Sequence, residues 1–575
     1  MSIETNISDI DDQWLESLPV QTADGQARRA AFSAATSTKQ TPTSLVSYLS
    51  AGYVLVIGDV ERALPVAQTL ARQDELEVVV YTPVYGRKVE PAHQNGIMHL
   101  HGPVAKVSGY LGQFQVSVNE NGMSKNIANL AGTGQDYFDI VLDLGTTPVL
   151  KNHTLPPGYF APGWDSDALS DALVQIPDMV GEFQKPKYFN FNPDICAHGN
   201  SGLTGCTRCI KSCSTLAITS LGDSIEVNPH LCQGLGTCAT VCPSGAMSYA
   251  YPLVNDLLEY VRQILNVYRE QGGNSPVIVF HDGEAGRKQL TSLTDNLPEY
   301  VIPIEIEEIG AIGIDTYITA LAYGAQYVVI LTTKTTTALT RSALQTQLHY
   351  GVALLKGMDY TADQLMLIEP DGANQLVSKL AGLVPFPALE PATFAAFDEK
   401  RTTLFLSLDH LYQQASTTNS VIELPEGAPF GEIQVNQTAC TLCMACVSVC
   451  PSGALEASDD KPQLSFIESK CVQCGLCDIA CPENAIHLSP RFVFDADARQ
   501  SRRTLNEEQP FHCVVCGVPF ASESVIKNMH KKLSDHWMFQ TEQAKRRLEM
   551  CEDCRVKDMF DQNEVVDVHK KPDLH

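Results

Sequence analysis

The chain has 575 residues, too many for one hydrophobic core, and this length implies roughly three to five domains. Its formal net charge of −27 argues against nucleic-acid binding, because phosphate contacts depend on clustered Lys and Arg. The apolar runs, such as residues 327–331, are far shorter than the roughly 20 residues of a membrane-spanning helix. Residues 1–11 are polar and acidic, without the basic and apolar regions of a signal peptide. We therefore expect a cytoplasmic protein with no membrane span.

The first half of the chain opens with a polar segment and continues with an α/β pattern. Residues 1–45 are rich in Ser, Thr, Gln, Asp and Ala, a composition that predicts a flexible tail or a peripheral helix without a core role. Residues 46–185 are expected to form a Rossmann-like α/β domain with a β insertion and a helix at residues 60–72. Its predicted strands are residues 53–57, 77–81 and 138–144, with a short antiparallel pair at 104–107 and 114–118.

The loop after the first strand does not carry the glycine pattern of a dinucleotide site. Such a site needs several glycines near the pyrophosphate and an acidic residue at the end of the second strand. Here the loop reads Gly58-Asp59-Val60-Glu61, and the second strand ends with Tyr81-Thr82-Pro83. Two carboxylates at this position would repel a phosphate. We expect a scaffold domain, with nucleotide or flavin binding as the alternative.

A second α/β domain is predicted for residues 253–392. It begins with an amphipathic helix, and strands then alternate with helices, which favours a parallel sheet. The strand candidates are residues 277–280, 301–304, 327–331 and 365–368. Residues 393–431 are expected to form a helix and a linker marked by Pro and Gly.

The most specific motif lies in residues 432–492, which we call module 2. Two runs of cysteines, each ending in Cys-Pro, have the spacing of a bacterial two-cluster ferredoxin, in which the fourth cysteine of each run ligates the other cluster. The predicted ligand sets are Cys440, Cys443, Cys446 and Cys481 for one [4Fe–4S] cluster, and Cys450, Cys471, Cys474 and Cys477 for its neighbour. Zinc knuckles would leave the repeat and both prolines unexplained.

Residues 186–252, which we call module 1, repeat this pattern with two departures. One predicted cluster has a full ligand set, with a Gly-rich insertion at residues 198–205, while the other keeps three cysteines. The two sets are Cys196, Cys206, Cys209 and Cys242, and Cys213, Cys232 and Cys238. Leu235 stands where the missing thiolate would be, and an aliphatic side chain cannot ligate iron. We expect a [3Fe–4S] cluster or a four-iron cluster with an outside ligand at the incomplete set, with the absence of this cluster as the third alternative.

Residues 493–575 contain two further CxxC pairs and are expected to form a small zinc-binding-like domain. The cysteines are Cys513, Cys516, Cys551 and Cys554, with about 35 residues between the pairs. This spacing is typical of a structural zinc site, which stabilises a segment that has little core. A fifth cluster and a redox dithiol are the alternatives, and His512, His530 and His536 are expected at the surface. All nineteen cysteines are then assigned, which leaves no support for a thiol nucleophile.

Two stretches resemble known families. One consists of Gly109-Tyr110-Leu111-Gly112-Gln113-Phe114-Gln115-Val116 and the later Pro186-Lys187-Tyr188. It resembles the segment before the inserted ferredoxin in the flavin-binding subunit of heterodisulfide reductase. The stretch from Ile309-Gly310 to Leu331, with Ala320 and Gly324-Ala325, resembles the delta subunit of methyl-viologen-reducing hydrogenase. Proteins of this build also resemble the polyferredoxins that accompany bacterial formate dehydrogenases. The resemblance implies an electron-relay subunit.

The sequence thus predicts a multidomain α/β plus α+β protein, with Rossmann-like α/β domains, two ferredoxin-like modules and a zinc-binding-like end. The leading hypothesis is a non-catalytic iron–sulfur protein that relays single electrons between partner oxidoreductases, formate dehydrogenase being one candidate. One alternative is a catalytic, flavin-dependent subunit similar to heterodisulfide reductase. The other is a cluster-bearing maturation or docking factor.

Overall fold

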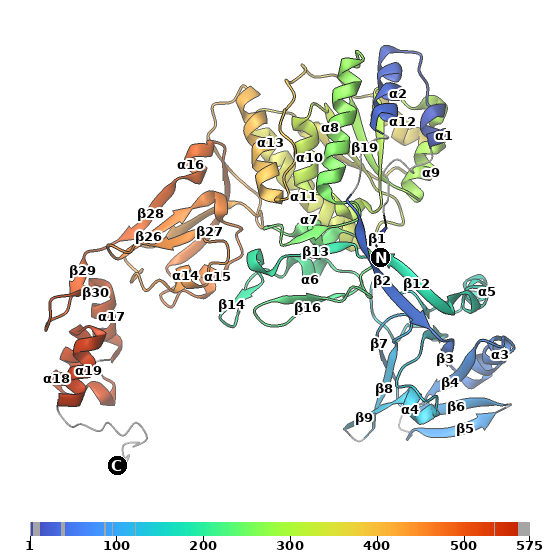
Figure 1. Ribbon diagram of the computed structural model, residues 1–575, viewed down its shortest axis with the longest axis horizontal. Helices are drawn as coiled ribbons and strands as arrows, with labels where there is room; N and C mark the ends of the chain where they lie inside the picture. Colours follow the sequence, from blue (N-terminus) through green and yellow to red (C-terminus); the bar gives the residue numbers. More distant parts are fainter. Residues whose placement is uncertain are drawn as a thin grey trace.

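The computed structural model describes residues 2–3, 12–35, 41–84, 88–94, 96–120, 122–533 and 535–561. The chain forms a mixed α/β structure of several parts, in which module 1 lies between two α/β parts and module 2 leads to the C-terminal segment (Figure 1). Residues 4–11 and 36–40 of the predicted tail, and residues 562–575 of the predicted C-terminal domain, lie outside the described residues. Within the described ranges, no helix combines the length and the apolar composition that a bilayer crossing requires.

The first α/β part is built on a six-stranded sheet in the order β11-β10-β3-β4-β6-β5. Its strands are β3 (Tyr53–Ile57), β4 (Glu77–Pro83), β5 (Glu90–Gln94), β6 (Ile97–Gly102), β10 (Ile140–Asp143) and β11 (Tyr159–Phe160). Neighbouring strands run parallel, apart from the antiparallel pair β5 and β6. The helix α3 (Val60–Leu70) connects β3 to β4, so the predicted βαβ unit is confirmed.

Apolar side chains of this sheet alternate between two cores, one on each face, as the two-residue period of a strand requires. In β3, Val54 and Val56 contact one core and Leu55 and Ile57 the other. The second core is covered by the expected antiparallel insertion. The covering elements are β7 (Lys106–Ser108), β8 (Gln115–Glu120), β9 (Met123–Asn126) and α4 (Ile127–Ala131), while α5 (Ser166–Gln175) covers the opposite face.

A three-stranded antiparallel ribbon connects the first α/β part to module 1. Its strands are β1 (Ser2–Ile3), β2 (Thr43–Ser50) and β12 (Gly181–Pro186). Tyr48 donates a hydrogen bond of 2.6 Å to the carbonyl of His230, and Lys185 donates one of 3.0 Å to the same oxygen. Because His230 precedes Cys232 by two residues, the ribbon holds one of the cysteine loops.

The second α/β part contains a four-stranded parallel sheet in the order β20-β19-β21-β22. Its strands are β19 (Val277–Asp282), β20 (Val301–Ile306), β21 (Tyr327–Leu331) and β22 (Leu365–Ile368). Its helices are α8 (Val254–Glu270), α9 (Ala285–Thr291), α10 (Ile314–Ala322), α11 (Ala338–Gly357), α12 (Ala373–Ala381) and α13 (Lys400–Gln414). Helices α8, α10, α11 and α13 share one core, and α9 and α12 pack on the other face. The predicted strands and their parallel order are confirmed.

The expectation that residues 1–45 have no core role is wrong. The helix α2 (Ala23–Ala35) packs along α8 and buries Ala27 and Ala31 in the core of the second α/β part. The helix α1 (Asp12–Ser17) packs on the other face of the same sheet. The composition was misleading because alanines four residues apart lie on one helix face and allow close packing without large apolar side chains.

The two modules and the C-terminal segment are made of short elements. Module 1 contains β13 (Phe189–Phe191), β14 (Gly199–Asn200), β15 (Leu203–Thr204), α6 (Arg208–Ser212), β16 (Ile218–Ser220), β17 (Ile225–Val227), α7 (Thr237–Val241) and β18 (Met247–Tyr249). Module 2 contains β24 (Gly431–Val435), α14 (Ala445–Ser448), β25 (Leu455–Ala457), β26 (Gln463–Ile467), α15 (Leu476–Ile479) and β27 (Ile486–Val493). The C-terminal segment contains α16 (Ala496–Gln500), β28 (Arg502–Glu507), β29 (Pro510–His512), β30 (Pro519–Ser522), α17 (Glu523–Leu533), α18 (Glu542–Arg546) and α19 (Glu552–Asp561).

Two strands cross the boundaries that the sequence predicts for module 2. The strand β23 (Val421–Glu423), in the predicted linker, pairs with β27. The strand β28, which follows residue 492, pairs with β26. Module 2 therefore takes backbone from both flanking segments to complete its sheets.

Module 1 contacts the second α/β part through two glycines. Gly236, just before α7, has a φ of 72°, and a Cβ there would lie 2.4 Å from Cα of Ala311. A Cβ on Gly310 would lie 2.3 Å from the main-chain oxygen of Leu235. Side chains at either position would separate the two backbones, so the contact depends on glycine.

We expect Gly236→Ala to loosen this contact, whereas Gly222→Ala in the same module serves as the matched control. Both glycines have a left-handed φ, 72° and 91°, but a Cβ on Gly222 would meet nothing within 4 Å. Alanine in a left-handed conformation costs about 1–2 kcal/mol in both variants. Only Gly236→Ala also brings a Cβ into a clash with Ala311. Hydrogen–deuterium exchange at residues 234–238 and 309–311 should therefore rise in the Gly236 variant. Equal exchange in both variants would contradict this prediction.

Candidate metal centres

Fifteen of the nineteen cysteines lie in the two modules, and we number their predicted ligand sets as sites 1 to 4. Site 1 is Cys213, Cys232 and Cys238, and site 2 is Cys196, Cys206, Cys209 and Cys242. Site 3 is Cys450, Cys471, Cys474 and Cys477, and site 4 is Cys440, Cys443, Cys446 and Cys481.

The backbone between the cysteines takes the same uncommon conformation in both loops of module 2. Leu442 and Met444 have left-handed φ values of 56° and 61°. At the equivalent positions of the second loop, Gln473 and Gly475 have values of 53° and 85°. Backbone of this kind turns successive N–H groups toward one centre, as in many anion and iron–sulfur sites. The repeat in sequence is therefore also a repeat in local structure.

The loop around Leu235 in module 1 has this conformation as well. Gly234 and Gly236 have left-handed φ values of 80° and 72°, at the positions of the two left-handed residues in the second loop of module 2. Leu235 thus occupies the position of Cys474 in a loop of the same shape. Site 1 retains the backbone of a cluster-binding loop and lacks one sulfur.

In module 2 the predicted ligands of each site lie close together in an apolar environment. The four cysteines of site 4 line one cavity, together with Leu464 and Ile486. Burial, with the negative charges of the other three site 4 cysteines, raises the pKa of Cys446 to about 12. Burial and the other site 3 cysteines raise the pKa of Cys477 far above its usual range. Thiolates packed in this way repel one another, and a cationic metal centre would compensate their charge.

Module 1 gathers its cysteines in the same manner. The four cysteines of site 2 line a second cavity, together with Phe191 and Met247. Burial, with the charges of the other three site 2 cysteines, raises the pKa of Cys209 to about 12. In site 1, burial raises the pKa of Cys238 well above its usual range, and the charges of Cys232 and Cys213 add to it. The residues present at all four sites therefore fit iron–sulfur clusters in charge and donor type.

Main-chain N–H groups point at several of these sulfurs. The bonds run from Ala217 to Sγ of Cys213 (3.3 Å), from Met247 to Sγ of Cys242 (3.4 Å) and from Ala485 to Sγ of Cys481 (3.3 Å). Each sulfur is the last cysteine of its run. Donors of this kind are among the factors that set the reduction potential of a cluster.

Cysteines of the two modules approach each other at sites 2 and 3. Burial raises the pKa of Cys474, and the negative charges of Cys450 and Cys206 raise it further. Cys450 belongs to the same site, but Cys206 belongs to module 1. The cysteine loops of the two modules therefore lie near each other.

The Gly-rich insertion at residues 198–205 carries much of this contact. A Cβ on Gly205 would lie 2.6 Å from Cγ of Leu476, in the α15 helix of module 2. Asn200, in the hairpin β14–β15, donates a hydrogen bond of 3.3 Å to the carbonyl of Ser448. The sequence identifies this segment as an insertion, and the structure shows that it reaches the other module.

Arg401, at the start of α13, was missed by sequence reasoning. It is 9% exposed and donates to the carbonyls of Pro243 (3.2 Å) and Cys471 (3.0 Å). Pro243 follows Cys242 of site 2, and Cys471 belongs to site 3. An arginine at a helix start is common in sequence, and only the tertiary structure places this one between two cysteine loops.

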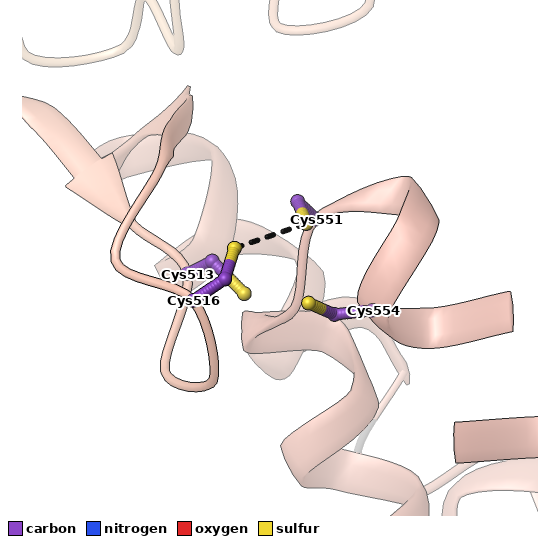
Figure 2. A group of neighbouring side chains, drawn as sticks. All are labelled: Cys513, Cys516, Cys551 and Cys554. Atoms are coloured by element: carbon purple, nitrogen blue, oxygen red, sulfur yellow. Dashed lines mark hydrogen bonds between the residues drawn. The ribbon is translucent and has the colours of Figure 1, made fainter. Parts of the chain in front are cut away.

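The four C-terminal cysteines form a separate group, which we call the knuckle site (Figure 2). Cys513 and Cys516 lie between β29 and β30, and Cys551 and Cys554 lie at the start of α19. Their sulfurs all lie within 4.8 Å of one another, and those of Cys516 and Cys551 are 3.6 Å apart. Thiolates bound to one tetrahedral ion at about 2.3 Å are about 3.8 Å apart. The knuckle site could therefore bind a single metal ion.

Hydrogen bonding favours the metal-binding form of one knuckle cysteine. Burial raises the pKa of Cys513, but the N–H groups of Cys516, Cys551 and Val515 outweigh it and lower the value to about 6. The thiolate is the form that ligates a metal. His512 and His536 are exposed, as expected, whereas His530 is half-buried and its Nε2 lies 3.1 Å from Oε1 of Glu549.

The C-terminal segment contacts the loop of site 4. Ser522, at the end of β30, donates a hydrogen bond of 2.8 Å to the carbonyl of Thr441, which lies between Cys440 and Cys443. Lys532 of α17 forms an ion pair of 2.7 Å with Glu483. The knuckle site and site 4 thus belong to neighbouring structural units.

Comparison with known proteins supports the interpretation of module 2. Residues 425–486 match the 4Fe-4S dicluster domain family. Over 85 residues the chain is 33% identical to hydrogenase-4 component A of Escherichia coli (strain K12), and this alignment covers 15% of the chain and 39% of the relative. The chain thus spans about two fifths of the length of the curated relative that it matches. The protein contains a 4Fe–4S dicluster domain.

We expect Cys551→Ser to empty the knuckle site without loss of cluster iron. A tetrahedral site with three thiolates binds its ion far more weakly, and the described segment has little core to compensate. Elemental analysis should show one non-iron metal ion per chain in the wild type and none in the variant. Ser522→Ala, which removes the bond to Thr441, is the control and should keep the ion. An unchanged ion content in the Cys551 variant would contradict the assignment.

Proposed function

We propose that the protein is a non-catalytic iron–sulfur electron carrier that relays single electrons between partner oxidoreductases. The observation that carries this proposal is that the four sites adjoin in one series. The negative charge of Cys209 in site 2 raises the pKa of Cys238 in site 1. The negative charge of Cys206 in site 2 likewise raises the pKa of Cys474 in site 3. The negative charge of Cys446 in site 4 raises the pKa of Cys477 in site 3. A chain of neighbouring sites is what a relay requires.

We assign [4Fe–4S] clusters to sites 2, 3 and 4, because each offers four thiolates. Site 1 offers three, and we assign it a [3Fe–4S] cluster, with a four-iron cluster and an outside ligand as the second candidate. When bound, such clusters accept and release single electrons. The chain itself would hold each cluster in a partly buried loop, and it directs main-chain N–H groups to sulfurs of sites 1, 2 and 4.

We assign zinc to the knuckle site, where it would have a structural role. The support is the close approach of four sulfurs, which suits one ion better than a cubane with its more widely spaced corners. The same geometry makes a fifth cluster the weaker candidate. In this proposal residues 46–185 and 253–392 are scaffold domains that carry the modules.

Oxidoreductase subunits are the proposed partners. The matched relative is a component of a hydrogenase by its name. Formate dehydrogenase is a second candidate, based on the resemblance to polyferredoxins that accompany this enzyme. The net charge of −27 favours docking to a basic face of either partner.

We expect Leu235→Cys to convert site 1 into a site with four thiolates. The loop already has the required backbone conformation, with left-handed residues on both sides of Leu235. Cluster iron should rise by about one atom per chain, and the three-iron EPR signal of mildly oxidised protein should disappear. Leu221→Cys, an exposed position in the same module, is the control and should change neither quantity. An unaltered three-iron signal in the Leu235 variant would contradict the assignment of site 1.

The relay itself is tested with protein isolated under anaerobic conditions together with its native partner. The chain should contain acid-labile sulfide and about 15 or 16 cluster irons. Substrate of the partner enzyme should reduce the clusters. A one-electron acceptor should then reoxidise them at least as fast as the partner enzyme turns over. Protein that stays oxidised in this assay would support a docking or maturation factor instead. Colourless protein without labile sulfide would overturn the proposal.

A further inference from the structure

The contact between sites 2 and 3 contains a buried guanidinium. Arg401 lies in the first turn of α13 and is 9% exposed. It donates four hydrogen bonds to main-chain carbonyls, those of Pro243 (3.2 Å), Pro429 (3.0 Å), Ser469 (3.1 Å) and Cys471 (3.0 Å). One rigid, planar group therefore joins the loop after Cys242 in site 2 to the loop of Cys471 in site 3.

The positive charge of Arg401 is not balanced by its hydrogen-bond partners. All four acceptors are neutral carbonyls, and the rings of Phe405 and Phe430 lie 5.0 Å from the guanidinium carbon. The guanidinium of an arginine is not deprotonated in proteins, so the group is charged at neutral pH. In surroundings of low polarity, such a charge acts strongly on nearby groups.

The preceding residue, Lys400, is a cation whose charge is balanced by a nearby carboxylate. Nζ of Lys400 donates to the carbonyls of Ala239 (2.9 Å) and Thr240 (2.8 Å) in α7. Oδ1 of the buried Asp315 lies 3.5 Å from the same nitrogen. The charge of Lys400 is therefore paired, whereas that of Arg401 is directed toward the cysteine loops.

We propose that Arg401 is a positioning residue for electron transfer between the modules, which holds sites 2 and 3 at a fixed separation and raises the reduction potential of both. This inference rests on the proposed function, because it requires clusters at both sites. Reduction adds negative charge to a cluster, and a buried cation beside it stabilises that charge. Because Arg401 is bonded to both loops, it raises the two potentials together and keeps them matched.

Arg499 is the matched control for Arg401. It is 2% exposed, and its guanidinium carbon lies 4.7 Å from the ring of Phe405, which both arginines share. It differs in being paired with Asp409, at 2.7 Å, and in donating to the carbonyl of Val493 rather than to a cysteine loop. Loss of either arginine removes a buried guanidinium from the same aromatic cluster, but only Arg401 adjoins the metal sites.

The test compares Arg401→Met, Arg401→Lys and Arg499→Met in the full chain, loaded with iron and sulfide under anaerobic conditions. Redox titrations followed by EPR give the cluster potentials. Hydrogen–deuterium exchange at residues 243–245 and 469–471 reports whether the two loops that Arg401 joins are still held in place. In Arg401→Met, reduction of two of the four clusters should become at least tenfold less favourable, ~59 mV for a one-electron couple. Exchange at both segments should rise. Arg401→Lys should restore the potentials but not the protection, because an ammonium cannot bond both loops in the same way.

The control separates a redox effect from a loss of stability. Arg499→Met should lower the thermal midpoint and leave all four potentials at their wild-type values. Unchanged potentials in Arg401→Met, or equal shifts in both methionine variants, would overturn the inference. If Arg401→Met fails to assemble clusters, Arg401→Lys decides, since a potential that falls despite the retained charge also overturns it. Wild-type protein without reducible clusters at these sites would instead refute the proposed function.

Discussion

Thiolates that are buried together repel one another, and this cost governs the arrangement of the two modules. Burial and neighbouring sulfurs raise the pKa of Cys446 and Cys209 to about 12. A metal centre removes this repulsion, and assembly of the clusters is thereby coupled to folding of the loops. The α/β parts, the ribbon of β2 and β12 and the C-terminal segment all contact these loops from outside. They supply the rigid framework that a set of short loops cannot provide.

The cysteine spacing predicted which cysteines lie together, because residues two apart in one loop are placed by short-range backbone geometry. The equivalent left-handed residues at Leu442 and Gln473 show that the repeat in sequence is a repeat in conformation. The alternation of strands and helices likewise predicted both parallel sheets. In each case the signal is local and repeats with a regular period.

Contacts between distant segments were not predictable in this way. The alanine face of α2 resembles a polar tail in composition, and its burial depends on α8, more than two hundred residues later in the chain. Arg401 is likewise unremarkable in sequence, since its acceptors Pro243 and Cys471 belong to two separate modules. The boundaries of module 2 were also misplaced, because its sheets take strands from both neighbouring segments. Each miss concerns a partner that only the folded chain brings near.

The hairpin β14–β15 separates two requirements that a simple ferredoxin combines. It is inserted between Cys196 and Cys206 of site 2, yet it touches α15 and Ser448 of the other module. The cysteines of site 2 and the residues that span the distance to module 2 are therefore different residues. If clusters occupy both modules as proposed, a longer or shorter hairpin would change the distance between sites 2 and 3 without removing a cysteine from either site.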